Sequence, residues 1–253
     1  MHRHMASTDQ PFSDGAESLL SGRQPDNDSS ANSRANDAEG AIVDLDGTIL
    51  DTLTDLTVSV NYALTQFSCP PRTKQEVRSF LGNGMKRLLT LSAPTITDPA
   101  AFQKLYDTFA AHYKVHCLDN TFPYKGIPEL LQELRDAHVR TAVVSNKGDF
   151  AVQEIISARF PGLFDYVVGE RPGISRKPAP DTVFACLKAF DLDASEAVYV
   201  GDSEVDKETA DNAQMPVILV DWGFRDRADL EKQGHMPIAS TPAELLNFIR
   251  KVR

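Results

Sequence analysis

Acidic residues gather in two short segments that lie far apart in the sequence. The first segment contains Asp44 and Asp46 in Asp-Leu-Asp-Gly-Thr, and the second contains Asp202 and Asp206 in Gly-Asp-Ser-Glu-Val-Asp. Carboxylate oxygens are the hard ligands that Mg²⁺ prefers, and several carboxylates brought together repel one another without a cation. A fold that unites the two segments would therefore form a site for Mg²⁺.

Hydroxyl, amide and ammonium groups occupy two further segments. Ser145, Asn146 and Lys147 follow one apolar run, and Lys177 stands in Arg-Lys-Pro. A serine hydroxyl can donate to a phosphate oxygen, and a lysine offsets the repulsion between a phosphate and nearby carboxylates. Together with the acidic residues, these groups favour Mg²⁺-assisted phosphoryl transfer.

Asp44 is the candidate nucleophile, because a strand directly before it would hold its carboxylate rigidly. A carboxylate can attack phosphorus and form an acyl phosphate, which divides hydrolysis into two steps. Asp46 could give a proton to the leaving oxygen and then activate water. Gly47, which precedes Thr48, lets the backbone approach the phosphate closely.

Each segment alone also has a purely structural interpretation. Asp-Gly-Thr is a common turn after a strand, Ser145-Asn146 could begin a turn, Lys177-Pro178 could lie in a surface loop, and Gly201-Asp202-Ser203 could begin a helix. The occurrence of all four in order, beside predicted strands, favours one shared site.

Strands and helices alternate through much of the chain, which predicts an α/β fold with a parallel, doubly wound sheet. The predicted strands are 41–45, 139–144, 166–168, 197–200 and 216–220, and the predicted helices are 128–137, 149–159, 180–190, 204–213 and a last one from 242. Such sheets bind ligands at the carboxyl ends of their strands. The four segments fall at or near these ends.

Residues 55–122 have helical periodicity and no convincing strand. Thr73-Lys74-Gln75-Glu76 has the form of a capping box, and Asp98-Pro99 is typical of a helix start. We therefore predict a helical cap over 55–122, inserted into a catalytic core of 40–54 and 123–253. Residues 1–39 are rich in polar residues without a period, which predicts a disordered tail.

Composition excludes several classes of protein. The 253 residues include 42% hydrophobic residues, enough for a core, and carry a net charge of −10, which disfavours nucleic-acid and anionic-membrane partners. No run of about 18 apolar residues is present, and because the first residues lack a continuous apolar segment, no secretory signal is expected. Three widely spaced cysteines indicate a reduced, cytoplasmic chain. The expected partner is a small phosphoester, and the oligomeric state, monomer or dimer, stays open.

The four segments resemble the four motifs of the haloacid dehalogenase-like phosphohydrolases, over about residues 40–253. The resemblance implies a Rossmann-like core with an inserted α-helical cap, with Asp44 as nucleophile and Asp46 as acid and base. It implies that Mg²⁺ is held by Asp44, Asp202 and the main-chain carbonyl of Asp46, while Asp206 lies beside these ligands or orients Lys177. The implied phosphate-binding residues are Gly47, Thr48, Ser145, Asn146 and Lys177.

Finer details are most similar to the phosphoglycolate phosphatases. The similar pieces are 143–147, 176–181, 201–213, 221–225 and the cap loop Gly82-Asn83-Gly84, whereas Lys207 and Gln214 depart from that group's pattern. This resemblance implies hydrolysis of 2-phosphoglycolate through an aspartyl-phosphate intermediate. A β-phosphoglucomutase-like phosphosugar mutase and a pyrophosphatase share all four motifs and stay as alternatives. Asp46 argues against a dehalogenase and against a protein that only binds.

Substrate choice is expected to reside in the cap, because the four motifs address only phosphate and metal. Backbone N–H groups of residues 82–84 are predicted contacts for a substrate carboxylate, and Lys86 or Arg87 could add charge there or could simply be solvated helix residues. His112 and His116, four apart on a predicted helix, could be imagined as zinc ligands. No third ligand is evident for them, so capping or solvated roles are favoured.

Overall fold

The computed structural model describes residues 38–252. Most of the predicted tail, 1–37, lies outside this range. Ala38 and Glu39, however, belong to the fold: Ala38 is buried, and the main-chain N–H of Glu39 donates to the carbonyl of Glu196 at 2.8 Å. The Glu39 carbonyl accepts from the N–H of Arg140, also at 2.8 Å. The predicted tail is therefore two residues too long, because these residues lead directly into the first strand.

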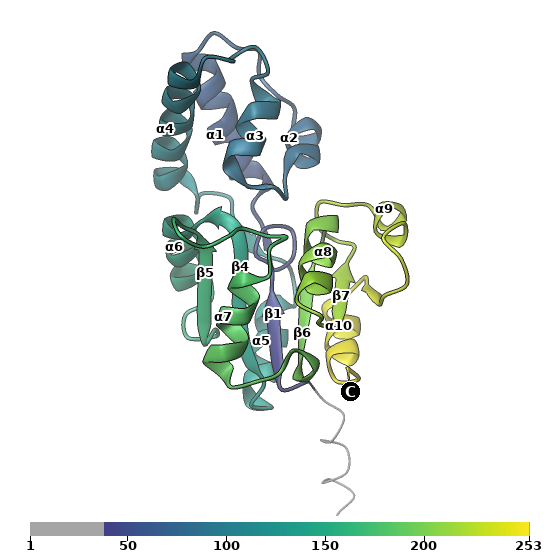
Figure 1. Cartoon of the computed structure of the whole chain (residues 1–253). Coiled ribbons are helices and arrows are strands. Elements are labelled where there is room, and N and C mark those ends of the chain that lie inside the picture. The colour runs from purple at the N-terminus through teal and green to yellow at the C-terminus, as the bar shows by residue number, and fades with distance from the viewer. Residues whose placement is uncertain (1–37, 253) are drawn as a thin grey trace, which may run out of the picture.

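A parallel sheet of six strands forms the centre of the described chain, in the order β5-β4-β1-β6-β7-β8 (Figure 1). The strands are β1 (Gly40–Val43), β4 (Arg140–Gly148), β5 (Tyr166–Glu170), β6 (Ala197–Gly201), β7 (Val217–Val220) and β8 (Ile238–Ala239). The order reverses at β1, where β4 leads outward on one side and β6 on the other. Ligands bind outside the carboxyl ends of strands at such a reversal. The predicted α/β fold with a parallel sheet is confirmed.

Helices cover both faces of the sheet. One layer consists of α7 (Asp181–Phe190) and α8 (Glu204–Asn212), and the other of α5 (Ile127–Asp136), α6 (Asp149–Arg159) and α10 (Pro242–Ile249). Successive strand residues serve opposite layers: Ile42 packs in the cluster with α7 and α8, whereas Ala41 and Val43 pack in the cluster with the other layer. This period of two explains the short, wholly apolar strands, which are buried on both faces.

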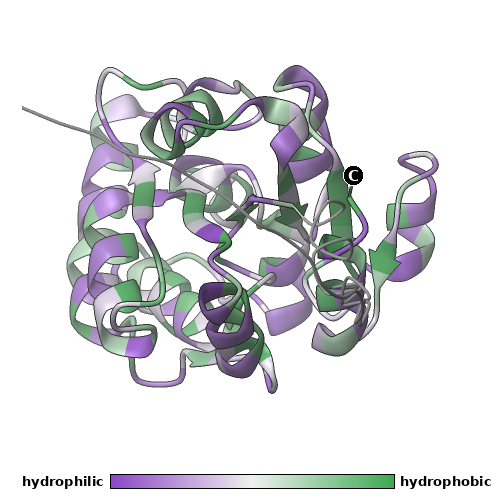
Figure 2. Cartoon of the chain, turned by 90° about the horizontal axis from the view of Figure 1, so that it is seen from below, coloured by the Kyte–Doolittle hydropathy of each residue, from purple (hydrophilic) through white to green (hydrophobic). Residues whose placement is uncertain are grey.

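Apolar residues lie where this layering requires them. Figure 2 shows hydrophobic residues on the strands and on helix sides that face the sheet, with hydrophilic residues on the outer sides. Two short elements, η2 (Ala194–Glu196) and α9 (Arg227–Glu231), complete the described core. Among residues 38–252, no helix is both long and apolar enough to cross a membrane.

Four helices between β2 and β3 stand above the carboxyl ends of the strands (Figure 1), and we call them the cap. They are α1 (Leu53–Gln66), α2 (Lys74–Phe80), α3 (Gly84–Ser92) and α4 (Pro99–His116). Two sequence predictions are confirmed here: Thr73 and Glu76 form a capping box at α2, and the Asp98 side chain caps α4 ahead of Pro99. Within the cap, no described segment is a strand.

The cap joins the core through two chain segments that are fastened together. β2 (Leu50–Asp51) and β3 (Phe122–Pro123), which the sequence did not predict, pair antiparallel. Beside them, the buried carboxylate of Asp55 accepts from the N–H of Asn120 at 2.8 Å and from the hydroxyl of Thr121 at 2.9 Å. The entry and exit of the cap therefore form one connection rather than two independent linkers.

Candidate active site

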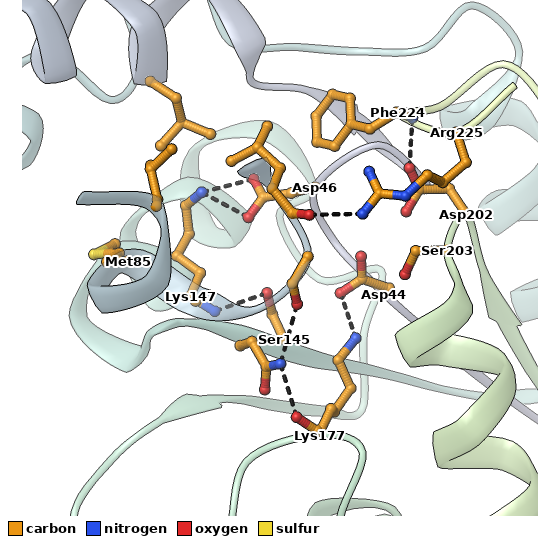
Figure 3. Close-up of a pocket in the computed structure, with 16 residues that line it drawn as sticks. Asp44, Asp46, Met85, Ser145, Lys147, Lys177, Asp202, Ser203, Phe224 and Arg225 are labelled. Carbon is orange, nitrogen blue, oxygen red and sulfur yellow. Dashed lines mark hydrogen bonds and ion pairs between the residues drawn. The ribbon is translucent and has the colours of Figure 1, made fainter. Parts of the chain in front are cut away.

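A pocket lies between the cap and the carboxyl ends of the central strands (Figure 3). The core contributes its polar lining: Asp44, Asp46, Ser145, Asn146, Lys147, Lys177, Asp202, Ser203 and Arg225, with Phe224. The cap contributes a mainly apolar lining: Leu56, Leu81, Gly82, Gly84, Met85 and Leu88. The cavity measures about 50 Å³, room for only a few water-sized groups.

The turn after β1 carries both predicted catalytic aspartates into this pocket. β1 ends at Val43, and the N–H of Asp44 still donates to the carbonyl of Val200 at 2.9 Å. Gly47 has a φ of +86°, and a Cβ on it would lie 2.2 Å from a carboxylate oxygen of Asp202. Only glycine permits this turn, because both the conformation and the space exclude a side chain.

Gly47 and Thr48, which the sequence predicts to bind phosphate, have hydrogen-bond partners within the protein. The N–H of Gly47 donates to the carbonyl of Leu50 at 2.9 Å, so it is already used within the turn. Thr48 is fully buried, and its carbonyl accepts from the indole N–H of Trp222 at 3.0 Å. Neither residue lines the pocket. Their contribution is to shape the turn that presents Asp46.

Lys177 brings the first and fourth motifs together. Its ammonium lies 2.7 Å from Asp44 Oδ1, 2.8 Å from Asp206 Oδ1 and 3.0 Å from the Tyr199 hydroxyl. All four side chains are buried. The sequence prediction that Asp206 and Lys177 lie together agrees with these distances, whereas Tyr199 was not foreseen because it reads as an ordinary strand residue.

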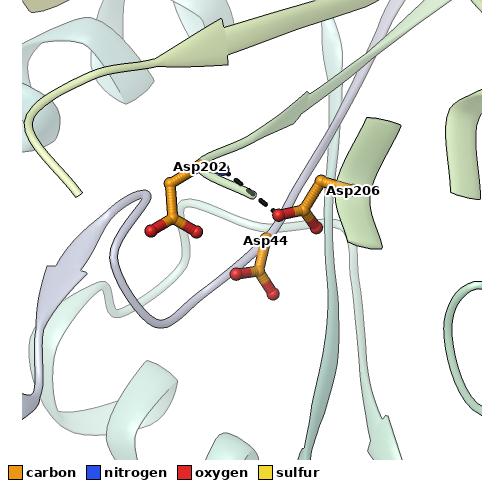
Figure 4. Close-up of side chains that lie close together, drawn as sticks. All are labelled: Asp44, Asp202 and Asp206. Carbon is orange, nitrogen blue, oxygen red and sulfur yellow. Dashed lines mark hydrogen bonds between the residues drawn. The ribbon is translucent and has the colours of Figure 1, made fainter. Parts of the chain in front are cut away.

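Three carboxylates meet beside this lysine. Oxygens of Asp44, Asp202 and Asp206 lie within 4.8 Å of one another (Figure 4). Asp206 Oδ1 accepts hydrogen bonds from the Lys177 ammonium and the Tyr199 hydroxyl. Asp206 Oδ2 accepts hydrogen bonds from the N–H groups of Asp202 and Ser203 and from the Ser203 hydroxyl. Asp206 is therefore saturated with donors. Asp44 has a single side-chain donor, Lys177, and Asp202 has a single main-chain donor, Phe224, so both keep oxygens free for a ligand.

Electrostatics in this cluster favour a cation. Burial raises the pKa of Asp44 to about 7, against the opposing effect of Lys177. Burial, and then the charges of Asp206 and Asp44, raise the pKa of Asp202 well above its usual range. Three buried carboxylates thus exceed the charge that one lysine neutralises. Hard oxygen ligands with surplus negative charge fit a divalent cation such as Mg²⁺.

An irregularity in β4 presents the second motif. The predicted strand end at residue 144 is too early, because β4 runs on to Gly148 and its register with β5 shifts between Val144 and Gly148. Such bulges turn side chains toward active sites. Here the bulge directs Ser145, Asn146 and Lys147 to the pocket.

These three residues differ in how free they are. The Ser145 hydroxyl accepts from the N–H of Lys147 at 3.2 Å and keeps its own hydrogen to donate. The Asn146 amide donates to the carbonyls of Gly82 in the cap, at 3.2 Å, and of Lys177, at 3.0 Å. Asn146 therefore ties the cap loop to the core, and its amide hydrogens are not free for the predicted phosphate contact.

Two pocket cations were absent from the predicted site residues. Lys147 lies 2.6 and 2.7 Å from the two carboxylate oxygens of Asp46. Arg225 pairs with Glu204 at 2.8 Å and donates to the cap carbonyl of Leu81 at 2.9 Å. Lys147 could have been found from its place directly after Ser145 and Asn146. Arg225 had no such signal, because its role depends on a main-chain carbonyl distant in sequence.

Of the two interpretations of Lys86 and Arg87, the structure favours solvated helix residues over contacts inside the pocket. Lys86 and Arg87 are exposed and do not line the pocket. They lie on the outer side of α3, which turns Met85 and Leu88, three residues apart, toward the pocket. The cap loop itself does reach the pocket, through Gly82 and Gly84.

The histidines of α4 have local partners. His112 Nδ1 lies 3.0 Å from the Ser59 hydroxyl, His116 Nδ1 lies 2.7 Å from Asp119, and the two rings stack at 4.3 Å. Among the residues that the structure describes, the only group of three or more side chains placed to bind one metal is the aspartate cluster.

Comparisons with known proteins agree with this geometry. Residues 41–220 match the family model of the haloacid dehalogenase-like hydrolases. A phosphoglycolate phosphatase of Caulobacter vibrioides is 32% identical over 204 residues, covering 77% of this chain and 84% of that protein. A phosphoglycolate phosphatase of Cereibacter sphaeroides is also 32% identical, covering 84% of this chain and 98% of that protein.

A solved structure gives the same result. One crystal structure is that of a protein from Lactobacillus delbrueckii subsp. bulgaricus that is described as a proposed phosphoglycolate phosphatase. It superposes on this chain with a TM-score of 0.80. It is 37% identical and covers 84% of this chain and 98% of that one. From the four motifs, the parallel sheet and these matches, we conclude that the chain belongs to the haloacid dehalogenase-like hydrolase family.

Proposed function

We propose that this protein is a Mg²⁺-dependent phosphatase of small phosphorylated metabolites, with 2-phosphoglycolate as the best candidate substrate. The observation that carries the proposal is the position of Asp44. Its buried carboxylate faces the pocket, with Lys177 at 2.7 Å and Asp202 and Asp206 close by. The two relatives that bear the name phosphoglycolate phosphatase support the choice of substrate.

In the proposed first step, a carboxylate oxygen of Asp44 attacks phosphorus. A bond forms between that oxygen and phosphorus, and the bond from phosphorus to the substrate's alkoxy oxygen breaks. Asp46, two residues further along the same turn, gives its proton to the departing oxygen, so that an alcohol leaves. Asp44 then carries the phosphoryl group as an acyl phosphate.

In the second step, Asp46 acts as a base. Its carboxylate takes a proton from a water molecule, whose oxygen attacks phosphorus. The acyl phosphate bond breaks, which restores Asp44 and releases inorganic phosphate. The Ser145 hydroxyl faces the pocket with a hydrogen for a phosphoryl oxygen, whereas Lys177, whose three hydrogens are directed at Asp44, Asp206 and Tyr199, contributes its positive charge. Both stabilise charge in the transition state.

Asp44, Asp202 and the Asp46 carbonyl are the proposed ligands of Mg²⁺. The free oxygens on Asp44 and Asp202, and the surplus charge of the cluster, support this assignment. When bound, the ion would neutralise charge on the phosphoryl oxygens and on the carboxylates. Asp206 serves a different purpose, since its donors leave no free position and it holds Lys177 against Asp44.

A small substrate suits the space under the cap. The cavity is narrow, and the cap side offers apolar groups and the backbone of Gly82 and Gly84. Lys147 and Arg225 also line the pocket and carry positive charge. A short acid on a phosphate fits such a lining, and closure of the cap would exclude water while the phosphoryl group is transferred.

A substrate screen tests the proposal. The purified chain is incubated with Mg²⁺ and, in turn, 2-phosphoglycolate, β-glucose 1-phosphate and pyrophosphate, and free phosphate is measured. We expect the highest kcat/KM for 2-phosphoglycolate and loss of activity with EDTA. Conversion of β-glucose 1-phosphate to its isomer would indicate a mutase, preference for pyrophosphate would indicate a pyrophosphatase, and no turnover would leave only a binding role.

A further inference from the structure

A buried ion pair stands at the boundary between the core and the cap. The ammonium of Lys147, from the bulge in β4, contacts both carboxylate oxygens of Asp46, at 2.6 and 2.7 Å. The Lys147 side chain is only 2% exposed, and that of Asp46 is 19% exposed. Because both oxygens face one ammonium, the Asp46 carboxylate is fixed in direction as well as in place.

The cap supplies the third member of this arrangement. The ring of Tyr113, on α4, lies with its centre 5.0 Å from the Lys147 ammonium, a distance at which a cation is attracted to an aromatic face. Tyr113 is fully buried. Burial lowers the pKa of Lys147, but Asp46 and Tyr113 raise it by more, so the lysine stays charged. A residue of the cap thereby contacts the group that holds Asp46.

We propose that Lys147 is a positioning residue that aligns Asp46 for proton transfer to the leaving group, and that Tyr113 links this alignment to the cap. The proposal rests on the proposed function, in which Asp46 is the acid. Lys177 contacts a different aspartate, the proposed nucleophile Asp44, and lies at a separate place in the pocket (Figure 3).

Leaving-group chemistry separates this role from others. An alkoxide is a poor leaving group and depends on a well-placed acid, whereas a nitrophenolate leaves without one. Asp46 is also the base of the second step, which all substrates share, so the comparison uses kcat/KM, which reports only the steps up to departure of the leaving group. A group that aligns the acid therefore matters for kcat/KM of alkyl phosphates and little for that of 4-nitrophenyl phosphate. If the group instead binds the substrate's carboxylate, its removal would raise KM for 2-phosphoglycolate alone.

The first experiment compares Lys147→Met with wild type on 2-phosphoglycolate, glycerol 1-phosphate and 4-nitrophenyl phosphate. We expect kcat/KM to fall about 10- to 100-fold for both alkyl phosphates and less than threefold for the aryl phosphate. Lys147→Arg should restore part of the loss, because it keeps the charge and two donors. Tyr113→Leu should give the same pattern with a smaller loss. Lys188→Met, at an exposed lysine on α7, is the matched control and should behave as wild type.

Three results would overturn the proposal. An equal loss of kcat/KM on all three substrates would mean that Lys147 only supports the fold or the phosphate site. A rise in KM confined to 2-phosphoglycolate would mean that it reads the carboxylate. An increase in kcat would mean that the pair holds Asp46 away from the reaction.

A second measurement needs no activity, so it separates this inference from the proposed function. Melting temperatures are compared for wild type, Asp46→Asn, Lys147→Met and the double variant. If Lys147 and Asp46 hold each other, the double variant loses clearly less than the sum of the two single losses. Additive losses would show that the pair is not coupled and would overturn the inference, even if the protein proves to be a phosphatase. If no phosphoester is hydrolysed, the proposed function fails, and additivity still decides whether the two side chains hold each other.

Discussion

The two sides of the pocket are built from different kinds of contact. On the core side, charged side chains contact one another directly, as Lys177 does with Asp44 and Asp206. Where the cap meets the core, side chains mostly contact main-chain carbonyls. Asn146 donates to Gly82, and Arg225 donates to Leu81.

This difference explains what each side can do. Charged side chains held by one another give the fixed geometry that phosphoryl transfer needs, and few substitutions preserve them. A carbonyl is present on every residue, so contacts to it allow the cap side chains to vary. The core is thus suited to common chemistry on phosphate, and the cap to differences among substrates.

The largest effect is expected at the centre of the core side. Asp44→Asn removes the attacking oxygen while nearly preserving shape, so kcat should fall about 10³-fold or more while the fold persists. Phosphate release and circular dichroism measure the two parts of this prediction. Activity within tenfold of wild type would mean that Asp44 is not the nucleophile.

A large loss of stability is expected when the core side loses its buried cation. Lys177→Met leaves three buried carboxylates without their partner, at a cost of about 3–5 kcal/mol in the free energy of unfolding. Burial raises the pKa of Asp44 and Lys177 opposes that rise, so removal of Lys177 should raise the folded-state pKa still further above its unfolded value. Stability is lost as pH rises toward the folded-state pKa, and in the variant this loss continues to a higher pH than in wild type, so the cost should be greater at pH 8 than at pH 6.

Urea unfolding at both pH values, without added metal, measures this loss, with Lys188→Met as the control. An equal loss at both pH values would contradict the electrostatic explanation. A loss below about 1 kcal/mol would show that Lys177 contributes no more than an exposed ion pair.

A moderate effect is expected at the contact between core and cap. Arg225→Met removes the bond to the Leu81 carbonyl and the pair with Glu204, and should lower kcat/KM about 5- to 30-fold, or about 1–2 kcal/mol. Steady-state kinetics on 2-phosphoglycolate measure it. Arg227→Met, which removes ion pairs outside the pocket, is the matched control. Equal losses of kcat/KM in the two variants would show that the contacts of Arg225 in the pocket matter no more than the ion pairs of Arg227 outside it.

The smallest effect is expected on the outer side of α3. Lys86 and Arg87 are exposed and lie outside the pocket, so their joint change to Ala should alter KM less than about twofold. A tenfold increase in KM for 2-phosphoglycolate, without a change in KM for 4-nitrophenyl phosphate, would show that Lys86 and Arg87 bind the substrate carboxylate.

Charged side chains of the core side could be predicted from the sequence, whereas contacts to main-chain carbonyls at the cap could not. Asp44, Asp46, Lys177, Asp202 and Asp206 could be found because acidic, basic and glycine residues at fixed spacing follow buried strands. Their meeting was inferred from the way parallel strands end at one edge of the sheet. The helical cap was readable from its period and capping residues.

Other features depended on tertiary contacts. Lys147 stands directly after Ser145 and Asn146 in the sequence, but its contact with Asp46 depends on the bulge in β4, which is set by strand pairing. Thr48 matches a motif, yet it is fully buried outside the pocket lining, and its carbonyl accepts from the indole N–H of Trp222. Lys86 and Arg87 seemed suited to bind a carboxylate by charge alone, but the side of α3 they occupy is set by the packing of Met85 and Leu88.

Chemical trapping of the acyl phosphate tests the central claim most directly. The enzyme is quenched during turnover of 2-phosphoglycolate with Mg²⁺ and reduced with borohydride, which converts a phosphorylated aspartate to homoserine. Mass spectrometry of the peptides then locates the modified residue. The mechanism proposed here predicts homoserine at position 44, none at Asp46, and none anywhere in Asp44→Asn. Modification at another aspartate, or turnover by Asp44→Asn near the wild-type rate, would contradict it.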